Sequence, residues 1–137
     1  MHKTLIIIFI ILFYSCGSDN STNPPSGSNY HDSDDSFITE LVSTNDIEMD
    51  SLINRITTIT KENYDRIVTM DLSNLELENL PANIDDLEYL EELDISNNLF
   101  SNLPEELCTV HSNIDDALFL ENNILCDPTE ITHCILI

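Results

Sequence analysis

Hydrophobic side chains between residues 67 and 110 recur at a fixed interval, and a third set follows 25 residues after the second. A shift of 23 residues places Ile67 on Leu90, Met70 on Leu93 and Leu72 on Ile95. The match continues at further apolar and polar positions: Leu77 with Phe100, Leu80 with Leu103, Pro81 with Pro104, Asp71 with Asp94 and Ser73 with Ser96. Agreement over one full period indicates an internal repeat.

Within each repeat, an apolar–polar–apolar triplet predicts a short strand. Its first and third side chains face inward and the middle one faces outward. Leu93, Asp94 and Ile95 form the clearest such triplet.

The repeats resemble the leucine-rich repeat, whose pattern is LxxLxLxxNxL. LEELDISNNLF matches it fully, IVTMDLSNLEL has Leu75 in place of the asparagine, and ALFLENNIL is a degenerate copy with Asp115 at its first leucine position. The spacing and the proline resemble the 23-residue bacterial subtype. The resemblance implies an α/β fold, a short solenoid of about three coils in which Asn98 and Asn123 hydrogen-bond neighbouring backbone groups.

A single coil cannot bury its leucine face, so both ends of the repeat need a cap. Ile47, Leu52, Ile53 and Ile56 recur at helical spacing after Asp46, and predict a helix near 46–58 with Asp46 as its N-cap. We expect an N-terminal helical cap over residues 37–66, repeats over 67–125 and a cysteine-containing C-terminal cap over 126–137.

The N-terminus has the pattern of an export signal. A positive start and the apolar run TLIIIFIILFY precede Ser15 and Cys16. This resembles the bacterial lipoprotein signal, which implies cleavage of residues 1–15 and lipidation of Cys16; Phe13 stands where that motif prefers leucine. The alternatives are ordinary cleavage with a free Cys16, which gives a secreted protein, or an uncleaved anchor. The polar residues 17–36 complete a flexible acidic linker over 16–36.

The charge of the chain excludes several partners. Four Lys and Arg against 26 Asp and Glu give a formal net charge of −22, which repels nucleic acids and anionic membrane surfaces. With two glycines, the chain also lacks the glycine-rich phosphate loops of nucleotide-binding proteins. The membrane contact that we expect is therefore the lipid on Cys16, in the cell envelope, at the outer membrane or the cell surface.

Three cysteines remain beyond Cys16. In an exported chain we expect a disulfide, and the short separation of Cys126 and Cys134 favours that pair, which leaves Cys108 as a small buried residue. Cys108–Cys126 and Cys108–Cys134 are the alternative pairs. A zinc site built from Cys108, His111 and the C-terminal Cys and His residues is disfavoured, because export disfavours free thiolates.

No catalytic arrangement stands out in the sequence. The histidines have no serine nucleophile motif beside them, and adjacent carboxylates such as Glu105–Glu106 are typical of a solvated surface. We therefore expect a non-enzymatic protein without a cofactor or a metal.

The resemblance implies that ligands meet the outward side chains of a concave strand face. Carried over by position, this face holds eight candidate binding residues: Thr69, Asp71, Ser73, Glu92, Asp94, Ser96, Phe119 and Glu121. Its acidity favours a protein partner with a basic patch. We expect a protein–protein interaction module; the alternative is a structural display module without a specific partner.

Overall fold

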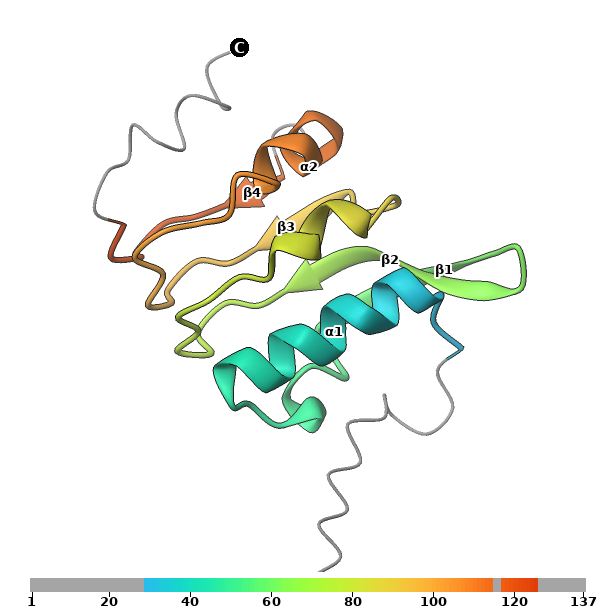
Figure 1. Ribbon diagram of the computed structural model, residues 1–137, viewed down its shortest axis with the longest axis horizontal. Coiled ribbons are helices and arrows are strands. Elements are labelled where there is room, and N and C mark those ends of the chain that lie inside the picture. The colour runs from blue at the N-terminus through green and yellow to red at the C-terminus, as the bar shows by residue number, and fades with distance from the viewer. Residues whose placement is uncertain (1–28, 115–116, 126–137) are drawn as a thin grey trace, which may run out of the picture.

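The computed structural model describes residues 29–114 and 117–125 (Figure 1). Within these residues the elements, in chain order, are α1 (Asp32–Asn45), the 3-10 helix η1 (Met49–Ser51), β1 (Ile56–Lys61), β2 (Tyr64–Asp71), the 3-10 helix η2 (Ala82–Asp86), β3 (Glu92–Asp94), α2 (Leu107–Ile114) and β4 (Leu118–Phe119). The strands form one sheet in the order β1-β2-β3-β4.

Strands β1 and β2 form an antiparallel hairpin. Its two turn residues, Glu62 and Asn63, both have positive φ angles, 53° and 74°. Positive φ at both positions defines a type I′ turn, whose twist matches that of the flanking strands. Close to the start of the hairpin the register shifts between Thr57 and Thr58, which is a β-bulge.

Strands β2, β3 and β4 run parallel to one another. Met70 lies beside Leu93, and Leu93 lies beside Leu118. The register therefore agrees with the spacing of the repeated sequence. Equivalent apolar positions of successive repeats thus lie side by side on neighbouring strands.

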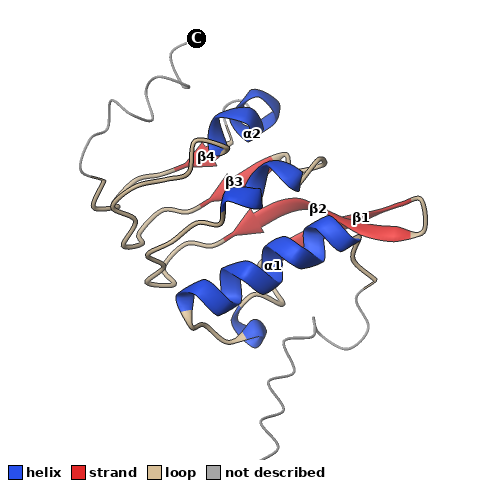
Figure 2. Cartoon of the chain, viewed as in Figure 1, coloured by secondary structure: helices blue, strands red, loops and turns tan. Residues whose placement is uncertain are grey.

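The core lies between the sheet and the helices α1, η2 and α2, which follow one another along one face of the sheet (Figure 2). Most of the repeated apolar positions of the two better repeats are buried, and Leu75 and Leu103 are partly buried against them. The core includes Ile67, Met70, Leu72, Leu77, Leu80, Ile84, Leu87, Leu90, Leu93, Ile95, Phe100, Leu107 and Val110. Helix α1 adds Phe37, Ile38 and Leu41.

Helix α1 is held to β2 by a buried ion pair. Asp34 Oδ1 lies 3.1 Å from Arg66 Nε, and the two side chains are 1% and 7% exposed. Asp34 Oδ2 accepts a 2.7 Å hydrogen bond from the backbone N–H of Ile67. On this side of β2 the pairing with β3 begins only at Thr69, so the carboxylate satisfies a donor that no β3 residue reaches.

The helix predicted near 46–58 is wrong. Asp46, the expected N-cap, is instead the left-handed C-cap of α1, with φ 51° and ψ 40°. The helix lies earlier because Asp32, Asp34 and Asp35 occupy its first turn, where carboxylates favour the positive end of the helix dipole. The sequence predicts a flexible linker over 16–36, and the structure has helix in its place from Asp32 onward.

The predicted fold class is also wrong. The described chain is a small mixed α/β structure with a four-stranded mixed sheet and two α-helices, not a leucine-rich-repeat solenoid with a helical N-terminal cap. The connections between the parallel strands differ, since the first contains the 3-10 helix η2 and the second the α-helix α2. An antiparallel hairpin, rather than a helix at 46–58, provides the first strand of the sheet.

The export signal, Cys16 and the expected C-terminal cap over 126–137 lie outside the described residues. Among the residues that the structure does describe, no helix is both long enough and apolar enough to cross a membrane.

Candidate binding surface

The sheet face that points away from the helices carries most of the predicted binding residues. The register places Thr69 beside Glu92, Asp71 beside Asp94, and Asp94 beside Phe119. Within each strand these side chains alternate with the buried Met70 and Leu93, so they share the opposite face. We call this set the outward row: Thr69, Asp71, Glu92, Asp94 and Phe119.

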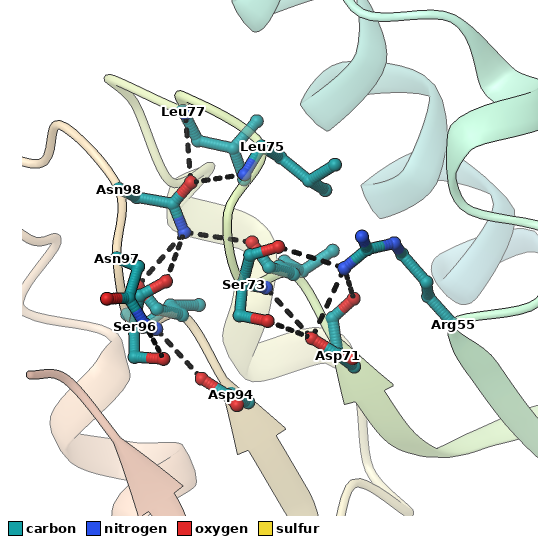
Figure 3. A network of polar contacts seen from close by, with 11 residues as sticks. Arg55, Asp71, Ser73, Leu75, Leu77, Asp94, Ser96, Asn97 and Asn98 are labelled. Atoms are coloured by element: carbon teal, nitrogen blue, oxygen red, sulfur yellow. Dashed lines mark hydrogen bonds and ion pairs between the residues drawn. The ribbon is translucent and has the colours of Figure 1, made fainter.

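Asp71 is the most extensively bonded carboxylate of the outward row. Its Oδ1 accepts hydrogen bonds from the Ser73 hydroxyl at 2.6 Å and from the Ser73 backbone N–H at 2.9 Å. Arg55 Nη1 lies 3.4 Å from the same oxygen (Figure 3). The Asp71 side chain nevertheless remains 56% exposed. The carboxylate is therefore fixed in position while still open to a ligand.

These contacts lower the pKa of Asp71. The hydrogen bond from the Ser73 hydroxyl has the largest effect; the Ser73 backbone N–H and the Arg55 guanidinium act in the same direction, and partial burial opposes them. Each of the three favours the charged form of the carboxyl. Asp71 thus keeps its negative charge to a lower pH than an ordinary aspartate does.

Asp94 repeats part of this arrangement one strand further on. Its Oδ1 accepts a 2.9 Å hydrogen bond from the backbone N–H of Ser96. Ser96 itself is buried, 7% exposed, and its hydroxyl accepts a bond from Asn97 Nδ2. Ser73 and Ser96 thus position the aspartates, and Ser96 is not part of the open surface.

The backbone under the outward row is fixed by Asn98. Its side-chain oxygen accepts from the N–H groups of Leu75 and Leu77, both at 3.1 Å. Its side-chain nitrogen donates to the carbonyls of Leu72, Ile95 and Ser96 (Figure 3). Asn98 is 3% exposed, so these bonds satisfy backbone groups that water does not reach.

Asn123 makes similar contacts after β4. Its oxygen accepts from the backbone N–H of Phe100, and its nitrogen donates to the carbonyls of Ile95 and Leu120. The expectation that Asn98 and Asn123 bond neighbouring backbone segments is confirmed by these contacts. Glu121, also predicted to bind, is exposed just past β4, and its carbonyl accepts from the Asn97 N–H.

The sequence analysis missed Arg55 as a member of this surface. Arg55 Nη1 donates to the carbonyl of Ser73 at 2.9 Å in addition to its contact with Asp71. A cation is rare in this chain, with four Lys and Arg in all, and that rarity was the available signal. Arg55 partly neutralises the β2 end of the outward row, so the open negative charge lies toward Glu92 and Asp94.

The described cysteine contradicts one expectation. Cys108 is disulfide-bonded, so the proposal that it is a small buried residue without a bond is wrong. The other three cysteines lie outside the described residues. With Cys16 lipidated, a bonded Cys108 leaves the alternative pairs Cys108–Cys126 and Cys108–Cys134, and either one excludes the Cys126–Cys134 pair.

The described residues do not assemble a metal centre. Over residues 29–114 and 117–125, no three His, Cys, Asp or Glu side chains are grouped so that they could hold an ion. A shallow hollow on the outer side of α1 is lined by Asp32, Asp35 and Glu40 with neighbouring Ser and Thr side chains. The outward row therefore presents negative charge and one exposed aromatic ring, groups that are suited to binding another molecule.

Comparison of the chain with protein-family models, with curated proteins and with solved structures found no match.

Proposed function

We propose that this protein is an exported, lipid-anchored module for protein–protein interaction at the cell envelope, without enzymatic activity. The outward row is its binding surface, and the partner presents a basic patch. The resemblance to bacterial leucine-rich-repeat proteins, made from the sequence, supports a recognition role. It does not extend to the fold, which over the described residues is a mixed four-stranded sheet with two α-helices.

The main observation in support of this proposal is that carboxylates and an exposed aromatic ring lie side by side on one face of the sheet. Asp71 is beside Asp94, and Asp94 is beside Phe119, across three parallel strands. Phe119 is 39% exposed. Arginine-rich surfaces combine with such a set through ion pairs to the carboxylates and stacking on the ring.

Rigidity also supports recognition by the outward row. Asp71 and Asp94 are held by hydrogen bonds from Ser73 and Ser96, and the backbone beneath them is fixed by Asn98. A surface whose side chains are already ordered loses less conformational entropy on binding. This distinguishes the outward row from the many exposed carboxylates elsewhere on this acidic chain.

The test is co-purification from the envelope of the source cell, with the full chain as bait. In the test variant Asp71→Asn, Glu92→Gln and Asp94→Asn are combined, so the charges disappear while the amide oxygens can still accept the serine bonds. The matched control combines Glu40→Gln, Glu78→Gln and Glu105→Gln, three exposed acids outside the row. Both variants change the net charge equally.

We expect a partner whose recovery falls at least about tenfold with the row variant but stays unchanged with the control, because complementary charge is lost only at the interface. Recovery should also fall as salt rises. Equal recovery with both variants would overturn the proposal. The anchor is tested separately by mass spectrometry of the exported chain, where an unmodified Cys16 would disprove lipidation.

A further inference from the structure

Strand β1 forms an open edge of the sheet. The sheet order β1-β2-β3-β4 leaves one side of β1 without a neighbouring strand among the described residues. The side chains of Thr57, Ile59, Thr60 and Lys61 are exposed. Figure 1 shows the hairpin turn between β1 and β2 projecting beyond the helices.

Both ends of the hairpin give the same direction for the backbone groups of β1. Lys61 and Tyr64 flank the two-residue turn and are the first hydrogen-bonded pair, and such pairs alternate along an antiparallel ladder. At the other end, the backbone carbonyl of Arg55 accepts a 2.8 Å hydrogen bond from the Asp71 N–H, so it points toward β2. Counting from either end, Ile56, Thr58 and Thr60 direct their N–H and C=O groups outward, to the open edge.

The bulge of the hairpin does not interrupt this edge. Thr57 pairs with Thr69 and Thr58 pairs with Ile67, so the extra residue, Val68, is on β2. Strand β1 itself runs unbroken from Ile56 to Lys61. Bulges protect a sheet edge when they distort the edge strand, and here the distortion lies on the inner strand.

The composition of β1 is also unusual for this chain. ITTITK consists of β-branched residues and one lysine, with neither proline nor an acidic residue, although the chain carries 26 Asp and Glu. β-Branched residues favour extended pairing, and natural edge strands usually carry charges or proline that prevent it. Strand β1 has one such charge, at its end, and presents the exposed Ile59 near its middle.

The strand is complementary to a second copy of itself. In an antiparallel pair centred on Ile59, Thr58 of one copy lies opposite Thr60 of the other, and these are the residues whose N–H and C=O groups point outward. Ile59 then meets Ile59, and Lys61 lies opposite Thr57. No like charges face each other, and the exposed isoleucine becomes covered.

We propose that β1 pairs with β1 of a second copy of this chain, antiparallel about a two-fold axis at Ile59, so that two four-stranded sheets join edge to edge. The occupant is a second copy rather than an unrelated strand because the register is self-complementary in hydrogen bonds, side chains and charge. This dimer does not depend on the outward row or on its partner. Because each copy carries a net charge of −22, the dimer strengthens as salt rises, the opposite of the partner binding proposed above.

The first test is cysteine crosslinking of the full chain in its own membrane. In this register Ile59 and its counterpart form a non-hydrogen-bonded pair with Cα atoms about 4.5 Å apart, which a disulfide can bridge. Ile59→Cys should give a covalent dimer on mild oxidation. Thr57→Cys, also exposed, should not, because its counterpart is Lys61; mixing Thr57→Cys with Lys61→Cys chains should restore crosslinking.

The second test exchanges charges at the axis. Ile59→Lys and Ile59→Glu chains should each dimerise at least about tenfold more weakly than the parent, because like charges meet at the axis. A mixture of the two should form a heterodimer, measured by sedimentation of the full chain in mild detergent. Ile124→Lys, at a 60% exposed isoleucine beyond β4, is the matched control and should leave association unchanged.

A monomer at every concentration and salt would overturn the proposal, as would a dimer that both Ile59 variants leave intact. Crosslinking of Thr57→Cys alone as efficiently as Ile59→Cys would disprove the register. None of these results bears on the outward row, so the two proposals fail separately.

Discussion

The described structure has two halves, residues 29–71 and residues 72–125. Different kinds of polar contact stabilise each of them internally. In the first, one buried ion pair between Asp34 and Arg66 joins α1 to β2. In the second, asparagine side chains at equivalent positions, Asn98 and Asn123, bond the backbone of neighbouring segments. When a contact that occurs once is removed, no similar contact nearby remains to stabilise the fold. When one of several equivalent contacts is removed, the others remain.

The largest effect is expected from removing the contact that occurs once. Asp34→Ala should lower the free energy of unfolding by about 3–5 kcal/mol, because it leaves the buried Arg66 guanidinium without its nearest carboxylate and the Ile67 N–H without an acceptor. Chemical denaturation measures this change. Glu88, 3.4 Å from Arg66 Nη1 and mostly exposed, compensates little.

Asp32→Ala is the matched control, since Asp32 lies in the same first turn of α1 but is exposed. It should cost at most about 1 kcal/mol, the usual value of a carboxylate at a helix N-terminus. The double variant Asp34→Ala with Arg66→Met should recover part of the loss. Equal losses for Asp34→Ala and Asp32→Ala would show that the ion pair does not hold α1.

The repeated contacts should differ in size according to burial. Asn98→Ala should cost about 2–4 kcal/mol, because five backbone groups lose a partner and four of these bonds are buried. Asn123→Ala should cost about half as much, since Asn123 is only partly buried and makes three such bonds. Thermal and denaturant unfolding of both variants check the ratio.

Asn102→Ala is the control for both asparagine variants. Asn102 is exposed, and its side-chain nitrogen donates to the hydroxyl of the neighbouring Ser101. Its replacement should change stability by no more than about 0.5 kcal/mol. A larger cost for Asn123→Ala than for Asn98→Ala would refute burial as the explanation of the ratio.

The smallest effect is a shift in the titration of Asp71. Ser73→Ala removes the largest cause of the lowered pKa, so the pKa of Asp71 should rise toward the ordinary 3.8. NMR titration of the carboxyl carbon measures it. Because the pKa of Asp71 is lower in the folded protein than in the unfolded chain, the charged carboxylate stabilises the fold at pH above the unfolded pKa. This stabilisation is lost as the pH falls through the folded pKa. The dependence of the unfolding free energy on pH in this range should therefore be smaller in Ser73→Ala. Ser101→Ala should leave it unchanged.

The contrast between the halves also explains what the sequence could predict. Spacing in the repeated sequence, which begins at Ile67 within the first half, correctly aligned Met70 with Leu93. The resemblance to leucine-rich repeats implied that Asn98 bonds neighbouring backbone, and the structure agrees. It placed Asp71, Asp94 and Phe119 on one face. Period and register follow directly from where apolar residues recur, so this part could be predicted.

The N-terminal half could not be predicted in the same way. Nothing in the order of residues 32–36 reveals that Asp34 will reach Arg66 and Ile67, more than thirty positions later. The apolar spacing of Ile47, Leu52 and Ile56 suited a helix equally well, and the hairpin pairing with β2 prevailed. A non-local partner decided the secondary structure there, and that partner carries no periodic signal.

The backbone contact between Asn29 and Asp65 fixes where the N-terminal chain leaves the body. The Asp65 N–H donates to the Asn29 carbonyl at 2.8 Å, next to the hairpin turn. With Cys16 acylated, as proposed, the residues from Cys16 to Asn29 reach at most about 45 Å. The open edge of β1 is then confined to a thin layer above the bilayer, where neighbouring copies diffuse in two dimensions. Confinement of this kind raises the effective concentration of each edge for the other, so even a weak β1 pairing would be populated on the membrane.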